Sequence, residues 1–160
     1  MSRNTLEITT QGDREILFHR IFNAPRAMVF DALTKPELLK RWFGPRAWEL
    51  AECQVDLRPG GKWRFLLRRK DGREMGMYGE YVEIAPPGHL VHTEQFDQYP
   101  GSSIITTRLV EQNGITTMTA TVVYDTPETR DGVLKSGMQG GAIETYDRLE
   151  ELLESAAHPA

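Results

Sequence analysis

The residues best suited to chemistry are His92 and Glu94, a histidine and a carboxylate separated by one threonine. On a β-strand, side chains two positions apart project from the same face, so this pair could act as a general acid and base. Catalysis of that kind also needs burial that shifts the pKa values of the two groups. Because the sequence does not show such burial, we favour a structural role for the pair, either facing solvent or hydrogen-bonded in the wall of a cavity.

The same two residues match the H-x-E segment of zinc deaminases, which also requires a P-C-x-x-C segment. The chain has one cysteine, Cys53, and it lies upstream of His92. We therefore expect no metal site. Dinucleotide-binding, phosphate-loop and nucleophile-elbow motifs do not occur in the sequence, so we expect no cofactor. We expect Cys53 to be a buried strand thiol, because no feature of the sequence would lower its pKa.

Neighbouring residues indicate which way the pair faces. Leu90 and Phe96 lie on the same face of the strand as His92 and Glu94. If the two apolar side chains face the core, His92 and Glu94 face inward as well. In residues 62–69, Trp63, Phe65 and Leu67 alternate with charged residues, and this apolar face is either ordinary core or the lining of a pocket. The residues that we expect to line a ligand pocket are Trp63, Phe65, Met77, His92, Glu94, Phe96, Thr107, Met138, Ala142 and Tyr146.

A long helix over residues 126–155 is expected to hold one wall of this pocket. Thr126 and Pro127 mark its start, since a capping hydroxyl followed by proline at the first helical position is typical of a helix N-terminus. Farther along, Tyr146 is followed at helical spacing by three leucines, which form an apolar stripe and predict packing against a sheet. These leucines are Leu149, Leu152 and Leu153.

Between the two ends of this helix lie Gly137, Gly140 and Gly141. Each glycine opposes helix formation by about 1 kcal/mol relative to alanine. A helix that carries this cost either approaches another group closely with its backbone or bends at that point. We expect the bend at Gly137, and we expect a cavity to lie under residues 138–142 rather than under the leucines.

The rest of the chain reads as a strand, two short helices and about six further strands, after a loose lead-in over residues 1–12. Asn113-Gly114 and Asp71-Gly72 are hairpin signals between strands. A change of phase in residues 74–84 predicts a bulge near Gly79. Consecutive strands with short turns predict an antiparallel sheet in an α+β fold. The expected strands are 15–22, 47–57, 62–69, 74–84, 89–97, 103–111 and 116–124, and the two short helices are 26–34 and 36–42.

Composition narrows the classes of function. A chain of 160 residues, 39% of them hydrophobic, is consistent with a single domain over 1–160 that has its own core. The net charge of −4 argues against nucleic-acid binding. No apolar run approaches the roughly 20 residues of a membrane span, and the first residues lack the apolar segment of a signal peptide. We expect a cytoplasmic protein with no nucleic-acid or membrane partner; a homodimer is compatible with the sequence.

Seven segments carry a resemblance to a known family. They are FNAPR (22–26), VFDA (29–32), PELLKRWFGP (36–45), VDLRPGGKW (55–63), GEYVEI (79–84), SGMQG (136–140) and YDRL (146–149). Together they resemble the family named after the activator of heat-shock protein 90 ATPase. This family lies within the START-like helix-grip superfamily, which includes the birch pollen allergen and polyketide cyclases. The resemblance covers about residues 15–155.

The resemblance implies a curved seven-stranded antiparallel sheet wrapped around the C-terminal helix, with an apolar cavity between them. Members of the superfamily bind lipids, hormones and polyketides, and a few catalyse cyclisation or hydrolysis. Our leading hypothesis is that the chain binds a small hydrophobic or amphipathic molecule in this cavity. One alternative is a cyclase or hydrolase that uses His92 and Glu94. The other is a co-chaperone-like protein-interaction module, as the family name suggests.

Overall fold

The computed structural model describes residues 5–157, which form one eight-stranded antiparallel sheet and four helices. The α+β class expected from the sequence is therefore confirmed. The strands are β1 (Glu7–Gln11), β2 (Glu15–Phe22), β3 (Trp48–Val55), β4 (Lys62–Arg69), β5 (Glu74–Ala85), β6 (His89–Phe96), β7 (Ser102–Gln112) and β8 (Ile115–Tyr124). The helices are α1 (Arg26–Thr34), α2 (Pro36–Trp42), α3 (Pro127–Lys135) and α4 (Met138–Ala157).

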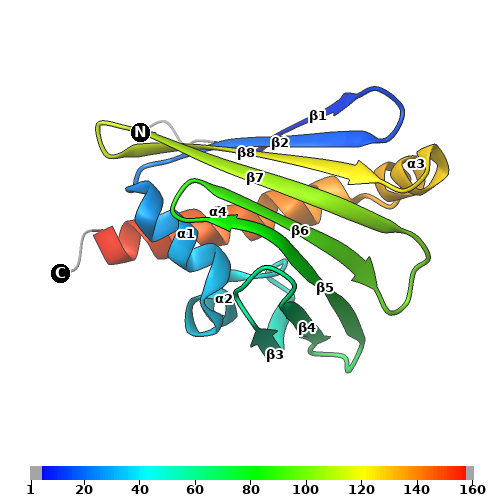
Figure 1. Ribbon diagram of the computed structural model, residues 1–160. Helices are drawn as coiled ribbons and strands as arrows, with labels where there is room; N and C mark the ends of the chain where they lie inside the picture. Colours follow the sequence, from blue (N-terminus) through cyan, green and yellow to red (C-terminus); the bar gives the residue numbers. More distant parts are fainter. Residues whose placement is uncertain (1–4, 158–160) are drawn as a thin grey trace.

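The sheet follows the order β1-β2-β8-β7-β6-β5-β4-β3, and each neighbouring pair is antiparallel. Figure 1 shows the sheet bending around α4, with α1 and α2 near the C-terminal end of this helix and α3 near its start. The apolar stripe of α4 packs as its spacing predicts. Leu149, Leu152 and Leu153 are buried in the same core as side chains of the sheet, α1 and α2.

The first strand corrects the predicted strand count and the predicted loose lead-in. Residues 7–11 form β1, which pairs with β2 so that Ile8 lies opposite Phe18. The sheet therefore has eight strands and not seven. The pattern was missed because β1 is an edge strand whose residues are almost all exposed, so it shows no apolar alternation. Residues 1–4, also part of the predicted lead-in, lie outside the described residues.

The last helical segment is two helices, not the single helix predicted. α3 ends at Lys135 and α4 begins at Met138, and Gly137 between them has a φ of +79°. A left-handed conformation suits glycine and terminates a helix, so the predicted bend at Gly137 is a complete break. The predicted start is confirmed, because the Thr126 hydroxyl accepts a hydrogen bond from the Thr129 backbone N–H at 3.1 Å.

Strand β5 contains the irregularity that its phase change predicts, but at a different residue. The register with β6 shifts between Tyr81 and Glu83, so the bulge lies beyond the predicted Gly79. Tyr81 lies before the shift and is buried, and the shift returns Ile84 to the inner face, where it packs against the core. Gly79 has a different role, since a Cβ there would lie 1.9 Å from the Thr93 carbonyl oxygen.

A buried ion pair joins β2 to α4. Arg20 is fully buried, and its guanidinium lies 2.8 Å from a carboxylate oxygen of Asp147 and 3.1 Å from one of Glu150. Asp147 and Glu150 are three positions apart on α4, so both can reach the same cation. Glu150 is only 4% exposed and faces Arg20.

Candidate functional site

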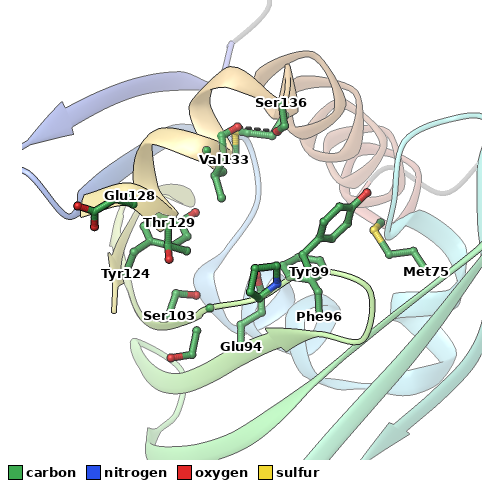
Figure 2. Close-up of a pocket in the computed structure, with 15 residues that line it drawn as sticks. Met75, Glu94, Phe96, Tyr99, Ser103, Tyr124, Glu128, Thr129, Val133 and Ser136 are labelled. Carbon is green, nitrogen blue, oxygen red and sulfur yellow. Dashed lines mark hydrogen bonds between the residues drawn. The ribbon is translucent and has the colours of Figure 1, made fainter. Parts of the chain in front are cut away.

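A cavity of about 690 Å³ lies between α3 and the adjoining ends of β6, β7 and β8. Its size is within the range of pockets that hold small molecules. Figure 2 shows its side chains arranged around the space, with α3 on one side and the strands on the other. The lining residues are Met75, Glu94, Phe96, Tyr99, Pro100, Gly101, Ser102, Ser103, Tyr124, Glu128, Thr129, Gly132, Val133, Ser136 and Met138.

Three polar residues cross the sheet side of the cavity in a single row. Glu94 of β6 pairs with Ser103 of β7, and Ser103 pairs with Tyr124 of β8. Directly opposed residues on adjacent strands project from the same face with Cβ atoms about 5 Å apart. All three line the cavity, and Ser103 and Tyr124 are buried. This polar row places a carboxyl group, a hydroxyl group and a phenol side by side against the space.

Helix α3 covers the cavity without filling it. Thr129, Gly132 and Val133 line the space, yet no residue of α3 is fully buried. The turn between β6 and β7 meets α3 directly, since a Cβ on Gly101 would lie 2.6 Å from Cγ2 of Thr129. The turn and α3 therefore enclose the cavity on this side, and the exposed ring of Tyr99 stands on the turn beside them.

The electrostatic character of the cavity centres on Glu94. Its side chain reaches solvent through the cavity, but the surrounding protein removes enough water to raise the pKa of its carboxyl group from 4.5 to about 7. Burial, together with the nearby Glu94 carboxylate, raises the pKa of Tyr146 to about 12 and raises the pKa of Tyr124 as well. At neutral pH the Glu94 carboxyl is therefore about half ionised, while both phenols are neutral.

His92 faces inward like Glu94 but lies outside the cavity lining. Its ring centroid is 5.7 Å from that of Trp63 and 6.2 Å from that of Tyr81. Burial lowers its pKa to about 4, so the imidazole is neutral at pH 7. Its Nδ1 atom has no hydrogen-bond partner among residues 5–157. The structure therefore places the two residues of the predicted pair on one face, but only Glu94 borders the cavity.

The other expected pocket residues divide into two groups. Glu94, Phe96 and Met138 line the cavity. The remaining side chains pack in the core or beside the cavity. Trp63 is one of these core residues, and its indole N–H donates a 3.1 Å hydrogen bond to the Thr93 carbonyl oxygen. Ala142 and Tyr146 contact the apolar cluster beneath α3, and Thr107 is buried on β7. The expected residues outside the lining are Trp63, Phe65, Met77, His92, Thr107, Ala142 and Tyr146.

The position of the cavity agrees with one part of the sequence argument. It borders Met138 and avoids the leucines of α4, as expected. It does not extend to Ala142 but continues under α3, because the break at Gly137 turns the segment before it over the strand ends. Gly141 instead makes a close approach elsewhere, since a Cβ there would lie 3.2 Å from Cγ of Pro45.

Sequence reasoning missed Ser103, Tyr124 and the lining residues of α3. Ser103 and Tyr124 lie at strand ends beside turns, where polar residues are common, so their type gave no signal. Their inward phase could have been found, because Tyr124 follows Met118, Ala120 and Val122 at alternate positions on β8.

Neither a metal site nor a membrane helix is found in the part of the chain that the structure describes. Within residues 5–157, His, Cys, Asp and Glu side chains form no group of three or more that could hold a metal ion. Among the same residues, no helix has the length and apolar character needed to cross a membrane.

Comparisons with known proteins agree with the fold. A family model described as "Activator of Hsp90 ATPase homolog 1-like protein" matches residues 23–154. A crystal structure from Rhodobacter sphaeroides is 32% identical, with a TM-score of 0.89 over 94% of this chain and 99% of the other. One from Nitrosomonas europaea is 28% identical, with a TM-score of 0.82 over 92% and 98% of the two chains.

A more distant solution structure, from Arthrobacter aurescens, is 22% identical, with a TM-score of 0.85 over 93% of this chain and 91% of the other. At this identity the likeness shows the fold alone. A search of curated proteins gives no match. These neighbours share the helix-grip fold of START-like proteins, in which a sheet wraps around a C-terminal helix.

Proposed function

This chain belongs to the Activator of Hsp90 ATPase homolog 1-like family, and from that premise we propose that it binds a small, partly apolar molecule in the cavity beneath α3. The observation that carries the proposal is the cavity itself, which combines an apolar wall with the polar row of Glu94, Ser103 and Tyr124. An apolar wall with a few placed polar groups is the usual composition of a small-molecule site.

The apolar part of the lining would supply most of the affinity. Phe96, Val133 and Met138 present carbon and sulfur surface to the space, and burial of apolar ligand surface contributes about 25 cal/mol per Å². Methionine also adapts its shape to different ligands. The polar row would orient the ligand, because its groups project from a rigid sheet.

Binding accounts for the site better than catalysis by His92 and Glu94. A catalytic group must reach the substrate within hydrogen-bond distance, and the imidazole of His92 is enclosed by Trp63 and Tyr81 rather than by the cavity. The proposed role therefore assigns ligand contact to Glu94 and a packing role to His92.

The test combines ligand recovery with a variant that fills the cavity. Native mass spectrometry of the protein purified from the cells that naturally make it should detect a retained small molecule. For the purified protein, we expect the neutral fluorophore N-phenyl-1-naphthylamine to bind with increased emission. Val133→Trp should weaken this binding about tenfold, since the loss of roughly 60 Å² of apolar contact removes about 1.5 kcal/mol.

Lys135→Trp is the matched control, because Lys135 is exposed on the same helix and does not line the cavity. It adds the same indole to α3 and should leave fluorophore binding unchanged. Equal binding by wild type and Val133→Trp, with no molecule recovered from the natural host, would contradict the proposed function.

A further inference from the structure

The charges that border the cavity are all of one sign. Glu94 and Glu128 are the charged residues of the lining, and no lining residue is lysine, arginine or histidine. The neighbouring cations are directed elsewhere. The Arg130 guanidinium donates to the carbonyl oxygens of Gly12 and Glu15, and Arg64 pairs with Asp97. A ligand carboxylate or phosphate would therefore meet no opposite charge in this cavity.

The Glu94 carboxyl group borders the cavity and is available to bind a ligand there. Among residues 5–157, no hydrogen bond or ion pair to its side chain is found in the structure. An ionised carboxylate that is shielded from much of the surrounding water is costly, so a ligand that donates hydrogen bonds to it or pairs with its charge would gain free energy on binding. Ser103 and Tyr124 add two hydroxyl oxygens on the adjacent strands.

Resting on the proposed function, we propose that the ligand of this cavity is a primary amine whose ammonium group is bound by Glu94, Ser103 and Tyr124, with its apolar part under α3. A primary ammonium group has three N–H donors and no acceptor. The polar row offers three groups whose oxygen atoms can accept, and one of these groups, the Glu94 carboxylate, carries a negative charge. Hydrogen bonds between an ammonium and a carboxylate are stronger than neutral ones.

The aromatic residues of the lining fit the same ligand. Phe96 and Tyr99 pack edge to face, with ring centroids 6.1 Å apart, at the side of the cavity nearest Glu94 on β6. Aromatic faces attract cations, and the attraction grows when water is excluded. The apolar chain of an amphipathic amine would then extend toward Val133 and Met138.

The proposal predicts a pH dependence with a definite sign. The ammonium binds the ionised Glu94 carboxylate, so affinity is full above the pKa of about 7 and is lost below it. An alkylamine with a pKa near that of lysine, about 10.4, stays protonated throughout this range. Affinity should therefore fall about tenfold between pH 8 and pH 6.

Other titratable groups near the site do not predict this change. Tyr124 and Tyr146, the phenols that face Glu94, have raised pKa values and stay neutral from pH 6 to 8. His92, which precedes Glu94 on the inner face of β6, has a pKa of about 4 and is also neutral there. On α3, Glu128 and Asp131 are exposed carboxylates and Lys135 is an exposed cation. Asp125, at the end of β8, has a pKa lowered by its hydrogen bond to Thr129 and stays ionised.

The experiment is isothermal titration of the protein with octylamine, 1-octanol and octanoate, which share one chain and differ in the head group. At pH 8 we expect octylamine to bind about tenfold or more tightly than octanol, and octanoate to bind most weakly. Octylamine affinity should fall about tenfold at pH 6, while octanol affinity should not change. This arm uses the unmodified protein and does not depend on the folding of a variant.

Glu94→Gln keeps the shape of the side chain and removes its charge. It should reduce octylamine affinity about tenfold or more, abolish the pH dependence and leave octanol binding unchanged. Asp131→Asn, at an exposed carboxylate of α3 that does not line the cavity, is the matched control and should change octylamine affinity less than about threefold.

The outcomes separate this inference from the proposed function. If octanol or octanoate binds as tightly as octylamine at pH 8, or if Glu94→Gln leaves octylamine affinity unchanged, the ammonium assignment is overturned while the cavity remains a binding site. If neither the three octyl probes nor N-phenyl-1-naphthylamine binds, the proposed function fails as well.

Discussion

Glu94→Gln should stabilise the protein in the absence of ligand, and the gain should grow with pH. The Glu94 pKa is about 7 in the folded protein against 4.5 as a free side chain. Between these values the folded state holds a proton that the unfolded state has released, so wild-type stability falls as pH rises. Glutamine has no proton to lose, and the difference in unfolding free energy between the variant and wild type therefore increases through this window.

The magnitude follows from the two pKa values. A shift from 4.5 to about 7 corresponds to a ceiling of about 3 kcal/mol, reached above pH 7. At pH 5 the expected difference in unfolding free energy is less than about 1 kcal/mol. The partial exposure of Glu94 through the cavity reduces these values, but it does not change their sign. A gain of even 1 kcal/mol is measurable against a typical total stability of 5–15 kcal/mol.

The assay is urea unfolding of both proteins at several pH values from 5 to 8, followed by tryptophan fluorescence. The difference between variant and wild type is the quantity to plot, because His92 complicates the wild-type curve alone. Burial lowers the pKa of His92 from 6.5 to about 4, so His92 makes the folded state more stable as pH rises through that window. Its slope opposes that of Glu94, and both proteins share it.

Asp131→Asn provides the comparison, since Asp131 is exposed on α3, does not line the cavity and should change the unfolding free energy by less than about 1 kcal/mol. A flat difference for Glu94→Gln, or one that decreases with rising pH, would show that the Glu94 carboxyl is not destabilised by burial.

Two further predictions concern the elements around the cavity. Arg20→Met should destabilise the protein by about 3–5 kcal/mol in urea unfolding, because it removes the buried cation that faces Asp147 and Glu150. Adding Asp147→Asn and Glu150→Gln should restore most of the lost stability. No recovery in the triple variant would refute the ion-pair explanation. Gly132→Ala should stabilise α3 by about 0.5–1 kcal/mol, since its Cβ meets open space. Gly137→Ala should instead destabilise α3 by about 1–2 kcal/mol, because the φ of Gly137 is +79°. Hydrogen exchange of the α3 amides measures the effect of both substitutions on the stability of this helix. Equal effects of the two substitutions would contradict the assignment of Gly137 as the residue that ends α3.

Much of the fold could be predicted from local patterns. The bounds of α1 and α2 agree with the predicted helices, because Pro25, Pro36 and the Gly44-Pro45 pair punctuate the chain at their ends. Strands β2 and β4 also agree with their predicted bounds; β4 has an apolar inner face, and β2 is ended by Asn23-Ala24-Pro25. β1 lacks such a face, and its existence depends on pairing with β2, which local sequence does not show.

The parts of the site that could be predicted are those that depend on the alternation of side chains within a single strand. The inward direction of Glu94 follows from its phase with Leu90 and Phe96, and the structure agrees. The polar row depends on two registers, which place Ser103 opposite both Glu94 and Tyr124. The β6–β7 register is set by the turn around Gly101, which has a φ of +97°, and the β7–β8 register by the hairpin turn at Asn113-Gly114. A slip of one residue would send each partner to the other face.

The two ends of the sheet differ in how well they are packed. In the C-terminal half of α4, leucines are fully packed against the sheet and the Arg20 ion pair ties the helix to β2. Across the break, α3 buries no side chain completely, and a desolvated carboxyl faces an open space. A protein selected for stability alone would fill that space and neutralise that charge. The groups that cost stability therefore gather at the end of the sheet where the proposed ligand would bind, while the other end is well packed.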